Sequence, residues 1–143
     1  IGKEDSLLDY NYYLVNTGRD TNHQMKVEGA LSDTSHKNFR GTIDFIKGCK
    51  GAKGDEREDI LLMDASVHNR TVPLILCSEE DVEGGHGASI GKLSEDIRFY
   101  VQSRGISEEE IIRLMAHARI DAVAGRIPDE ETRSLIMNSE TAL

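Results

Sequence analysis

The feature that most constrains this chain is a change of hydrophobic period near Gly91. Before that point, apolar residues recur at every second position within short segments, as in strands with one buried face. After it, apolar residues recur at the three- and four-residue spacing of helices. The 143 residues therefore predict a mainly β part followed by a smaller helical part.

Five segments of the β part carry the strand signal, and polar or glycine-rich turns separate them. Their centres fall near residues 12, 27, 42, 61 and 75, so the steps are about 14 to 19 residues. Strands of sandwiches and barrels usually recur every ~8–12 residues. The longer step favours a β-solenoid, in which each coil stacks on the last, and a sandwich with long loops has a similar pattern.

Two stretches of the β part predict turns. Residues 47–59 are rich in glycine and charge, and the four carboxylates of residues 55–59 indicate a solvated, charged turn. Residues 81–91 place His86 among glycines, which indicates a tight corner before the helices. The glycines of residues 87–93 lack the spacing and the hydroxyl of a phosphate-binding loop, so no nucleotide site is predicted.

Three helices are predicted in the last fifty residues. Ser94 is a suitable N-cap for the first, which ends at Gly105. Ser107 and Glu110 have the spacing of a capping box for the second, and Pro128 opens a weaker third. The second helix carries an apolar stripe of Ile111, Leu114, Met115 and Ala118. This tail is expected to pack on the end of the β part or to dock on a partner.

Composition excludes several classes of function. The formal net charge is −9 and the basic residues are dispersed, which argues against nucleic acids and anionic membranes as partners. No apolar run approaches the ~18 residues of a membrane span, and the start at Ile1 does not read as a signal peptide. Two cysteines 28 residues apart form no disulfide framework, so a reduced, cytoplasmic compartment is expected.

The cysteines and histidines are the residues with chemical potential. Cys77 follows three apolar residues, which favours burial, whereas Cys49 lies beside two lysines in a glycine loop. Nearby positive charge lowers a thiol pKa, so Cys49 is the more reactive candidate and a candidate ligand for iron. The five histidines show no metal-binding spacing, and no serine or cysteine nucleophile motif is present.

Three stretches, taken in order, resemble the SufB and SufD scaffold proteins of Fe–S cluster assembly. They are residues 36–45, residues 81–91 with the run HGASIG, and residues 99–107 with the run FYVQSRGIS. The likeness is nearer to SufD than to SufB. It covers nearly the whole chain and only the C-terminal part of those longer proteins.

The resemblance implies a fold and a set of partners. Residues 1–91 would form the C-terminal coils of a right-handed parallel β-helix (a β-solenoid), and residues 92–143 a small α-helical subdomain. The protein would be a non-catalytic cytoplasmic scaffold. Its β-helix edge would pair with a SufB- or SufD-type protein or a second copy, and its C-terminal helices would dock a SufC-type ABC ATPase.

The resemblance also ranks candidate ligands for a transient Fe–S cluster or iron, with none stably bound to this part of the chain. SufD carries a cysteine two residues before its histidine, and here Gly84 stands there while His86 is kept. The SufB thiolate position falls near Glu58. His86 and Glu83 are therefore the candidate cluster or iron ligands, and Cys49 and Glu58 are further candidates for a metal.

Two other functions fit the same residues. A metal-dependent enzyme could use His86 with the carboxylates of residues 55–59. A degenerate family member that serves only as a structural and dimerisation module would explain the absence of cysteine at Gly84 and Glu58.

Overall fold

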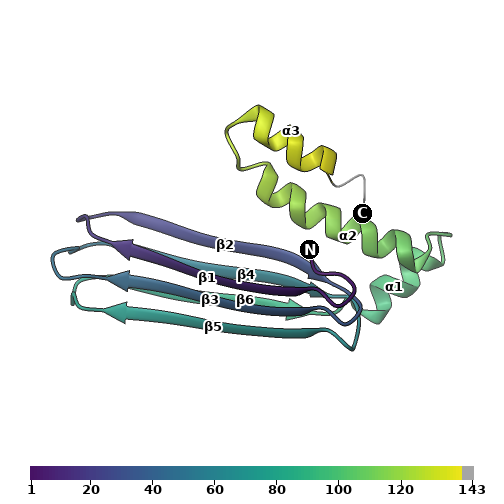
Figure 1. Ribbon diagram of the computed structural model, residues 1–143, viewed down its shortest axis with the longest axis horizontal. Helices are drawn as coiled ribbons and strands as arrows, with labels where there is room; N and C mark the ends of the chain where they lie inside the picture. Colours follow the sequence, from purple (N-terminus) through teal and green to yellow (C-terminus); the bar gives the residue numbers. More distant parts are fainter. Residues whose placement is uncertain (140–143) are drawn as a thin grey trace.

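The structure, a computed structural model, describes residues 1–139 and contains six strands followed by three helices (Figure 1). The elements are β1 (Leu7–Asn16), β2 (Asn22–Leu31), β3 (His36–Phe45), β4 (Lys53–Leu62), β5 (His68–Cys77), β6 (Glu83–Gly91), α1 (Glu95–Gln102), α2 (Glu108–Ala124) and α3 (Glu130–Ser139). The prediction of a mainly β chain with a helical C-terminal part is confirmed.

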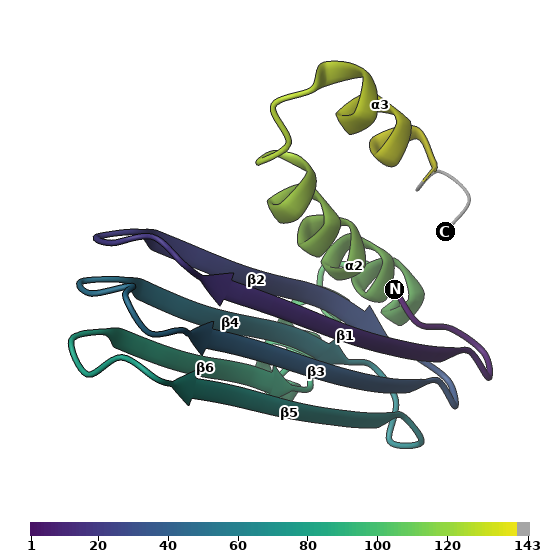
Figure 2. The ribbon, with the colours of Figure 1, turned by 60° about the vertical axis from the view of Figure 1, so that its left-hand side comes forward.

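The six strands form two parallel three-stranded sheets, in the orders β1-β3-β5 and β2-β4-β6. Consecutive strands lie in different sheets, and the two sheets face each other in layers (Figure 2). Each strand pairs in register with the strand two along, as Leu7 does with His36 and His36 with His68. Neighbours within a sheet are therefore about 30 residues apart, and the shorter steps of the sequence separate strands of opposite sheets.

Both predicted turns in the β part were wrong. Residues 55–59 lie within β4, where Glu56 and Glu58 are buried rather than solvated. His86 lies on β6 and not at a corner. The two errors have one physical cause, because a strand whose inward positions are glycine, glutamate or histidine has no apolar alternation to reveal it.

Carboxylates connect the successive turns at the end of the sheets where β2 and β4 finish. Glu4 and Asp33 both have positive φ, 54° and 57°, a conformation that few non-glycine residues adopt. The backbone N–H of Glu4 donates to Asp33 Oδ2 at 2.9 Å, and that of Asp33 donates to Asp64 Oδ2 at 2.7 Å. Each turn thus satisfies a backbone donor with the acid of the turn that follows, which fixes the register of the stack.

Two clusters of buried side chains stabilise the layers. One lies between the sheets and consists of Ile43, Phe45, Cys49 and Ala52. The other joins Ala30 and Leu61, on the outer face of the β2-β4-β6 sheet, to Ala116 of α2. The α2 helix therefore covers part of that outer face, and an ion pair between Arg119 and Asp59 fixes it there.

The helix boundaries follow the predicted caps, whereas the predicted packing face of α2 is partly wrong. Ser94 accepts a hydrogen bond from the Ile97 N–H, and Ser107 and Glu110 form the reciprocal capping box. The buried face of α2 includes Ile111 and Ala116, while Leu114 is 55% exposed. The small Ala116 side chain, and not Leu114, allows the close approach to Ala30. No helix within residues 1–139 is long and apolar enough to cross a membrane.

The carboxylate of Asp33 should make stability depend on pH in the acid range. Hydrogen bonds from the Glu4 N–H and then from the Ser32 hydroxyl lower the pKa of Asp33. A depressed pKa stabilises the fold above the unfolded value of about 3.9, and this contribution is lost as pH falls through the folded value. We expect Asp33→Asn, which tolerates positive φ, to lower the thermal midpoint at pH 7 and to differ less from the wild type at pH 3.

The matched control is Asp5→Asn, which removes an exposed carboxylate two residues before β1. Its thermal midpoint should stay within the error of the wild type at both pH values. A deficit of Asp33→Asn that is as large at pH 3 as at pH 7 would show that the hydrogen-bonded carboxylate is not the cause.

Candidate functional site

The polar side chains with the most unusual surroundings lie between the two sheets. Alternation along β4 turns Glu56 and Glu58 inward, and alternation along β6 turns His86 inward beside them. Lys37 reaches them from β3 in the opposite sheet. We call Lys37, Glu56, Glu58 and His86 the interior polar cluster.

Lys37 and Glu58 form a buried ion pair, and their residues are only 4% and 2% exposed. The Lys37 ammonium donates to Glu58 Oε1, to Asn69 Oδ1 at 3.1 Å and to Thr71 Oγ1 at 3.5 Å. Glu58 Oε2 is also buried, and it has no hydrogen-bond partner within residues 1–139. The lysine is therefore fully engaged, while the glutamate keeps one acceptor oxygen that is not used.

Glu56 lies against the backbone of the opposite sheet. A Cβ atom at Gly41 would overlap Glu56 Oε2, so glycine at that position makes room for the carboxyl group. Burial, and then the charge of Glu58, raises the pKa of Glu56 above its ordinary value, while His86 and Lys37 oppose the shift. Glu56 therefore keeps its proton to a higher pH than an exposed glutamate.

His86 is the member of the interior polar cluster that solvent reaches. It is the register partner of Glu56, and β6 is the last strand of its sheet, so one side of His86 is open. Burial decreases from Glu58 through Glu56 to the exposed His86. The cluster thus extends from a dry interior to the edge of the sheets.

Gly84 lies two residues before His86 and faces the same interior. A Cβ atom there would lie 2.9 Å from Ile75 Cγ2 and 3.1 Å from Phe45 Cε2. Apolar atoms therefore fill the space that a cysteine side chain at this position would occupy.

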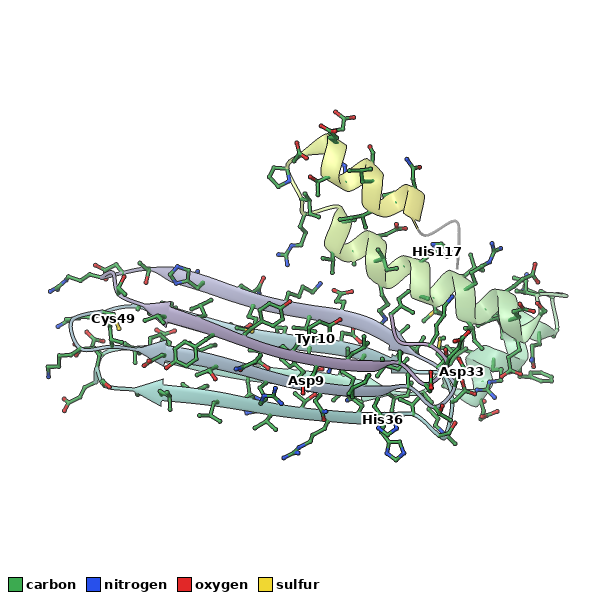
Figure 3. The ribbon with its side chains drawn as sticks, viewed as in Figure 1. Asp9, Tyr10, Asp33, His36, Cys49 and His117 are labelled. Atoms are coloured by element: carbon green, nitrogen blue, oxygen red, sulfur yellow. The ribbon has the colours of Figure 1, made fainter. Side chains whose placement is uncertain are left out.

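The other predicted ligands lie apart from the interior polar cluster. Glu83 is exposed on the outer face of β6, where it pairs with Lys53 at 2.7 Å. Cys49 is fully buried among Ile43, Phe45 and Ala52, and Figure 3 shows it at one end of the sheets.

The expected exposure of the two cysteines was reversed, since Cys77 is the exposed one. Burial, and then the charge of Glu79, raises the pKa of the Cys49 thiol, so the prediction of a reactive Cys49 thiolate was wrong.

The structure brings together two predicted residues, His86 and Glu58, and adds Glu56 and Lys37. No group of three or more His, Cys, Asp or Glu side chains in residues 1–139 has an arrangement that could hold a metal ion. The sequence contains a signal for Glu56 that was not used. Glu56 and Glu58 alternate in phase with Ile60, which is the pattern of inward positions on one strand.

Comparison with known proteins gives a consistent result. The family model for the SufBD core domain of the SUF system of FeS cluster assembly matches residues 1–119. The iron-sulfur cluster assembly SufBD family protein of Mycobacterium tuberculosis is 27% identical over 127 residues, which are 89% of this chain and 15% of that protein. The iron-sulfur cluster assembly protein SufD of Bacillus subtilis is 22% identical over 138 residues, 96% of this chain and 32% of that protein.

A SufBD family protein of Staphylococcus epidermidis is 32% identical over 92 residues, 64% of this chain and 20% of that protein. The chain therefore spans less than a third of the length of these relatives.

Removal of one partner of the buried ion pair should strongly destabilise the fold. Lys37→Met leaves the Glu58 carboxylate buried without a cation, and we expect it to lower the free energy of unfolding by about 3–5 kcal/mol. Adding Glu58→Leu should restore most of the loss, because an apolar pair carries no desolvation cost. Urea denaturation of the four proteins of this double-mutant cycle measures both effects.

The exposed pair of Lys53 and Glu83 provides the control. Lys53→Met should cost about 1 kcal/mol or less, as is typical of surface pairs. If Lys37→Met cost no more than Lys53→Met, the Lys37–Glu58 pair would not be buried in solution.

A side chain at position 84 should disturb the packing between the sheets. We expect Gly84→Ala to lower the free energy of unfolding by about 1–2 kcal/mol, because Ile75 and Phe45 must move. Gly91→Ala is the control, since a Cβ atom there meets no neighbouring atom within 4 Å. Equal stability of the two variants in thermal melts would show that the space beside His86 is open.

Proposed function

Because the chain belongs to the SufBD family of the SUF system of FeS cluster assembly, we propose that it is part of a cytoplasmic scaffold on which Fe–S clusters are assembled. The observation that carries the proposal is the family match over residues 1–119. In this role the chain binds cargo and partner proteins and catalyses no reaction itself.

The architecture supports a scaffold built from stacked coils. Consecutive strands alternate between the sheets, and strands about 30 residues apart pair in register. We infer that residues 1–91 are coils of a right-handed parallel β-helix and that residues 92–143 form the helical subdomain. A stack of coils needs only a narrow apolar interior, which agrees with seven aromatic residues and no tryptophan.

The interior polar cluster is the proposed place of contact with iron. Imidazole and carboxylate groups both suit iron ions, and His86 is the group that an ion from solvent meets first. Glu56, the register partner of His86, adds a second ligand once it loses its proton. The free Glu58 Oε2 lies deeper, and Lys37 already neutralises that carboxylate. Glu83 and Cys49 are weaker candidates because they lie outside this cluster.

Two surfaces suit the proposed protein partners. The strands β5 and β6 each end a sheet, so their outer edges carry backbone groups that can pair with a strand of another SufB- or SufD-type chain. The helices expose several large apolar side chains, Ile97, Phe99, Tyr100, Leu114 and Leu135. This helical surface is the proposed docking site for a SufC-type ATPase.

A purely structural module is the second candidate function. It is favoured by the glycine at position 84 and by the engagement of Glu58 with Lys37, since neither residue offers a thiolate or a free carboxylate to a cluster. Such a module would join the same complex without binding iron.

Anaerobic reconstitution of the full chain with SufB- and SufC-type partners tests the proposal. We expect a stable complex that takes up iron and sulfide and gains the visible absorption of an Fe–S cluster. His86→Ala should lower the iron content by about tenfold without dissociating the complex, because it removes the accessible ligand. Iron analysis and size-exclusion chromatography measure the two quantities separately.

The matched control is His23→Ala, which removes a histidine from β2 that bonds to Asn16. Its iron content should equal that of the wild type. Complex formation without iron would support the structural module, and the absence of any complex would refute both candidate functions.

A further inference from the structure

A second group of histidines lies on the opposite side of the molecule from the interior polar cluster. His36 and His68 are register partners on the adjacent strands β3 and β5, and both are exposed. Their rings stack with 4.4 Å between the centroids and 13° between the planes. Figure 3 shows His36 at the end of the strands where Asp33 lies, away from Cys49.

We propose that His36 and His68 bind one divalent transition-metal ion on the outer face of the β1-β3-β5 sheet. Lys37 and Asn69, the next residues on the two strands, contact each other between the sheets. The two histidines therefore point outward, since successive side chains of a strand alternate. The site is thus separate from His86, which belongs to the other sheet.

The backbone fixes the spacing of the two imidazoles. The N–H of His36 donates to the Ser6 carbonyl at 2.8 Å, and the N–H of His68 donates to the Ser35 carbonyl at 3.0 Å. Each histidine is the first residue of its strand, so the turn before it holds its Cα atom in place. The distance between the two side chains is therefore set before a metal arrives, which lowers the entropic cost of binding.

The exposed rings can reach the geometry that a metal ion requires. Imidazole nitrogens bind at about 2.0–2.1 Å, so two ligands of one ion lie about 3 Å apart. Stacked rings with 4.4 Å between centroids need only a rotation about the Cβ–Cγ bonds to direct one nitrogen from each toward a common point. The solvent around both rings leaves this rotation free.

The donor set selects the class of ion. Two neutral imidazoles suit Cu²⁺, Ni²⁺ and Zn²⁺, whereas Mg²⁺ and Ca²⁺ require oxygen ligands. No third His, Cys, Asp or Glu side chain in the described part of the chain completes the site, so water fills the other positions. We therefore expect the strongest binding for Cu²⁺ and weaker binding for Ni²⁺ and Zn²⁺.

A bound ion would stabilise the stack of strands. It would connect β3 to β5, whose paired histidines are 32 positions apart in the sequence. A ligand that binds only the folded state raises its stability by mass action. The two histidines then act as a metal-dependent clamp across neighbouring strands.

Isothermal titration calorimetry of tag-free, EDTA-treated protein with Ni²⁺ and Cu²⁺ tests the proposal. We expect one ion per chain at the two histidines and a rise of the thermal midpoint with Ni²⁺. His36→Asn and His68→Asn should each weaken binding by about tenfold or more, because one imidazole ligand is lost. In the Cu²⁺ complex, electron paramagnetic resonance should show hyperfine coupling to two imidazole nitrogens.

His23→Asn and His86→Asn are the control variants, and both should bind as the wild type does. Melting of each variant without metal confirms that it is folded, which the exposure of both rings leads us to expect. The proposal is overturned if the wild type shows no saturable binding, or if His36→Asn and His68→Asn bind as tightly as it does. Neither result bears on iron at His86.

Discussion

The structure depends on the parallel register between strands about 30 residues apart in the sequence. In this register each inward position of one strand lies beside the inward position of the next strand, so the interior is built in layers. A slip of one residue would turn every inward side chain to the outer face. Glu58 would then lose Lys37, and Gly54 would no longer face Ile43. The linked turns at Glu4, Asp33 and Asp64 oppose such a slip.

The sequence predicted those strands whose interior positions are apolar. Leu8, Tyr10, Tyr12 and Leu14 alternate along β1, and the predicted segment and the observed strand agree within one residue at each end. The first half of β4 was missed because its inward positions are Gly54, Glu56 and Glu58. Hydrophobic periodicity needs contrast between the two faces of a strand, and a partly polar interior removes it. Only the register with β3 shows that Lys37 compensates Glu58.

The candidate site was predictable in part for the same reason. The family resemblance directed attention to His86 and to the position of Glu58, and the structure adds Glu56 because it is the register partner of His86. The two cysteines could not be ranked from neighbouring residues alone. Cys77 ends an edge strand and remains exposed, while the loop that carries Cys49 folds over Phe45 and buries the thiol. Burial then outweighs the nearby lysines and raises the pKa of Cys49.

The Lys37–Glu58 pair determines what the interior can accept more than how stable it is. A buried ion pair pays a desolvation cost, and an apolar pair of similar volume is often at least as stable. With Lys37 charged, Glu58 ionised and Glu56 protonated, these three groups are neutral together, so the interior folds without a cation. Loss of the Glu56 proton would leave one negative charge beside His86. Binding of a cation at His86 is therefore coupled to release of that proton, and the raised pKa of Glu56 makes the binding stronger as pH rises.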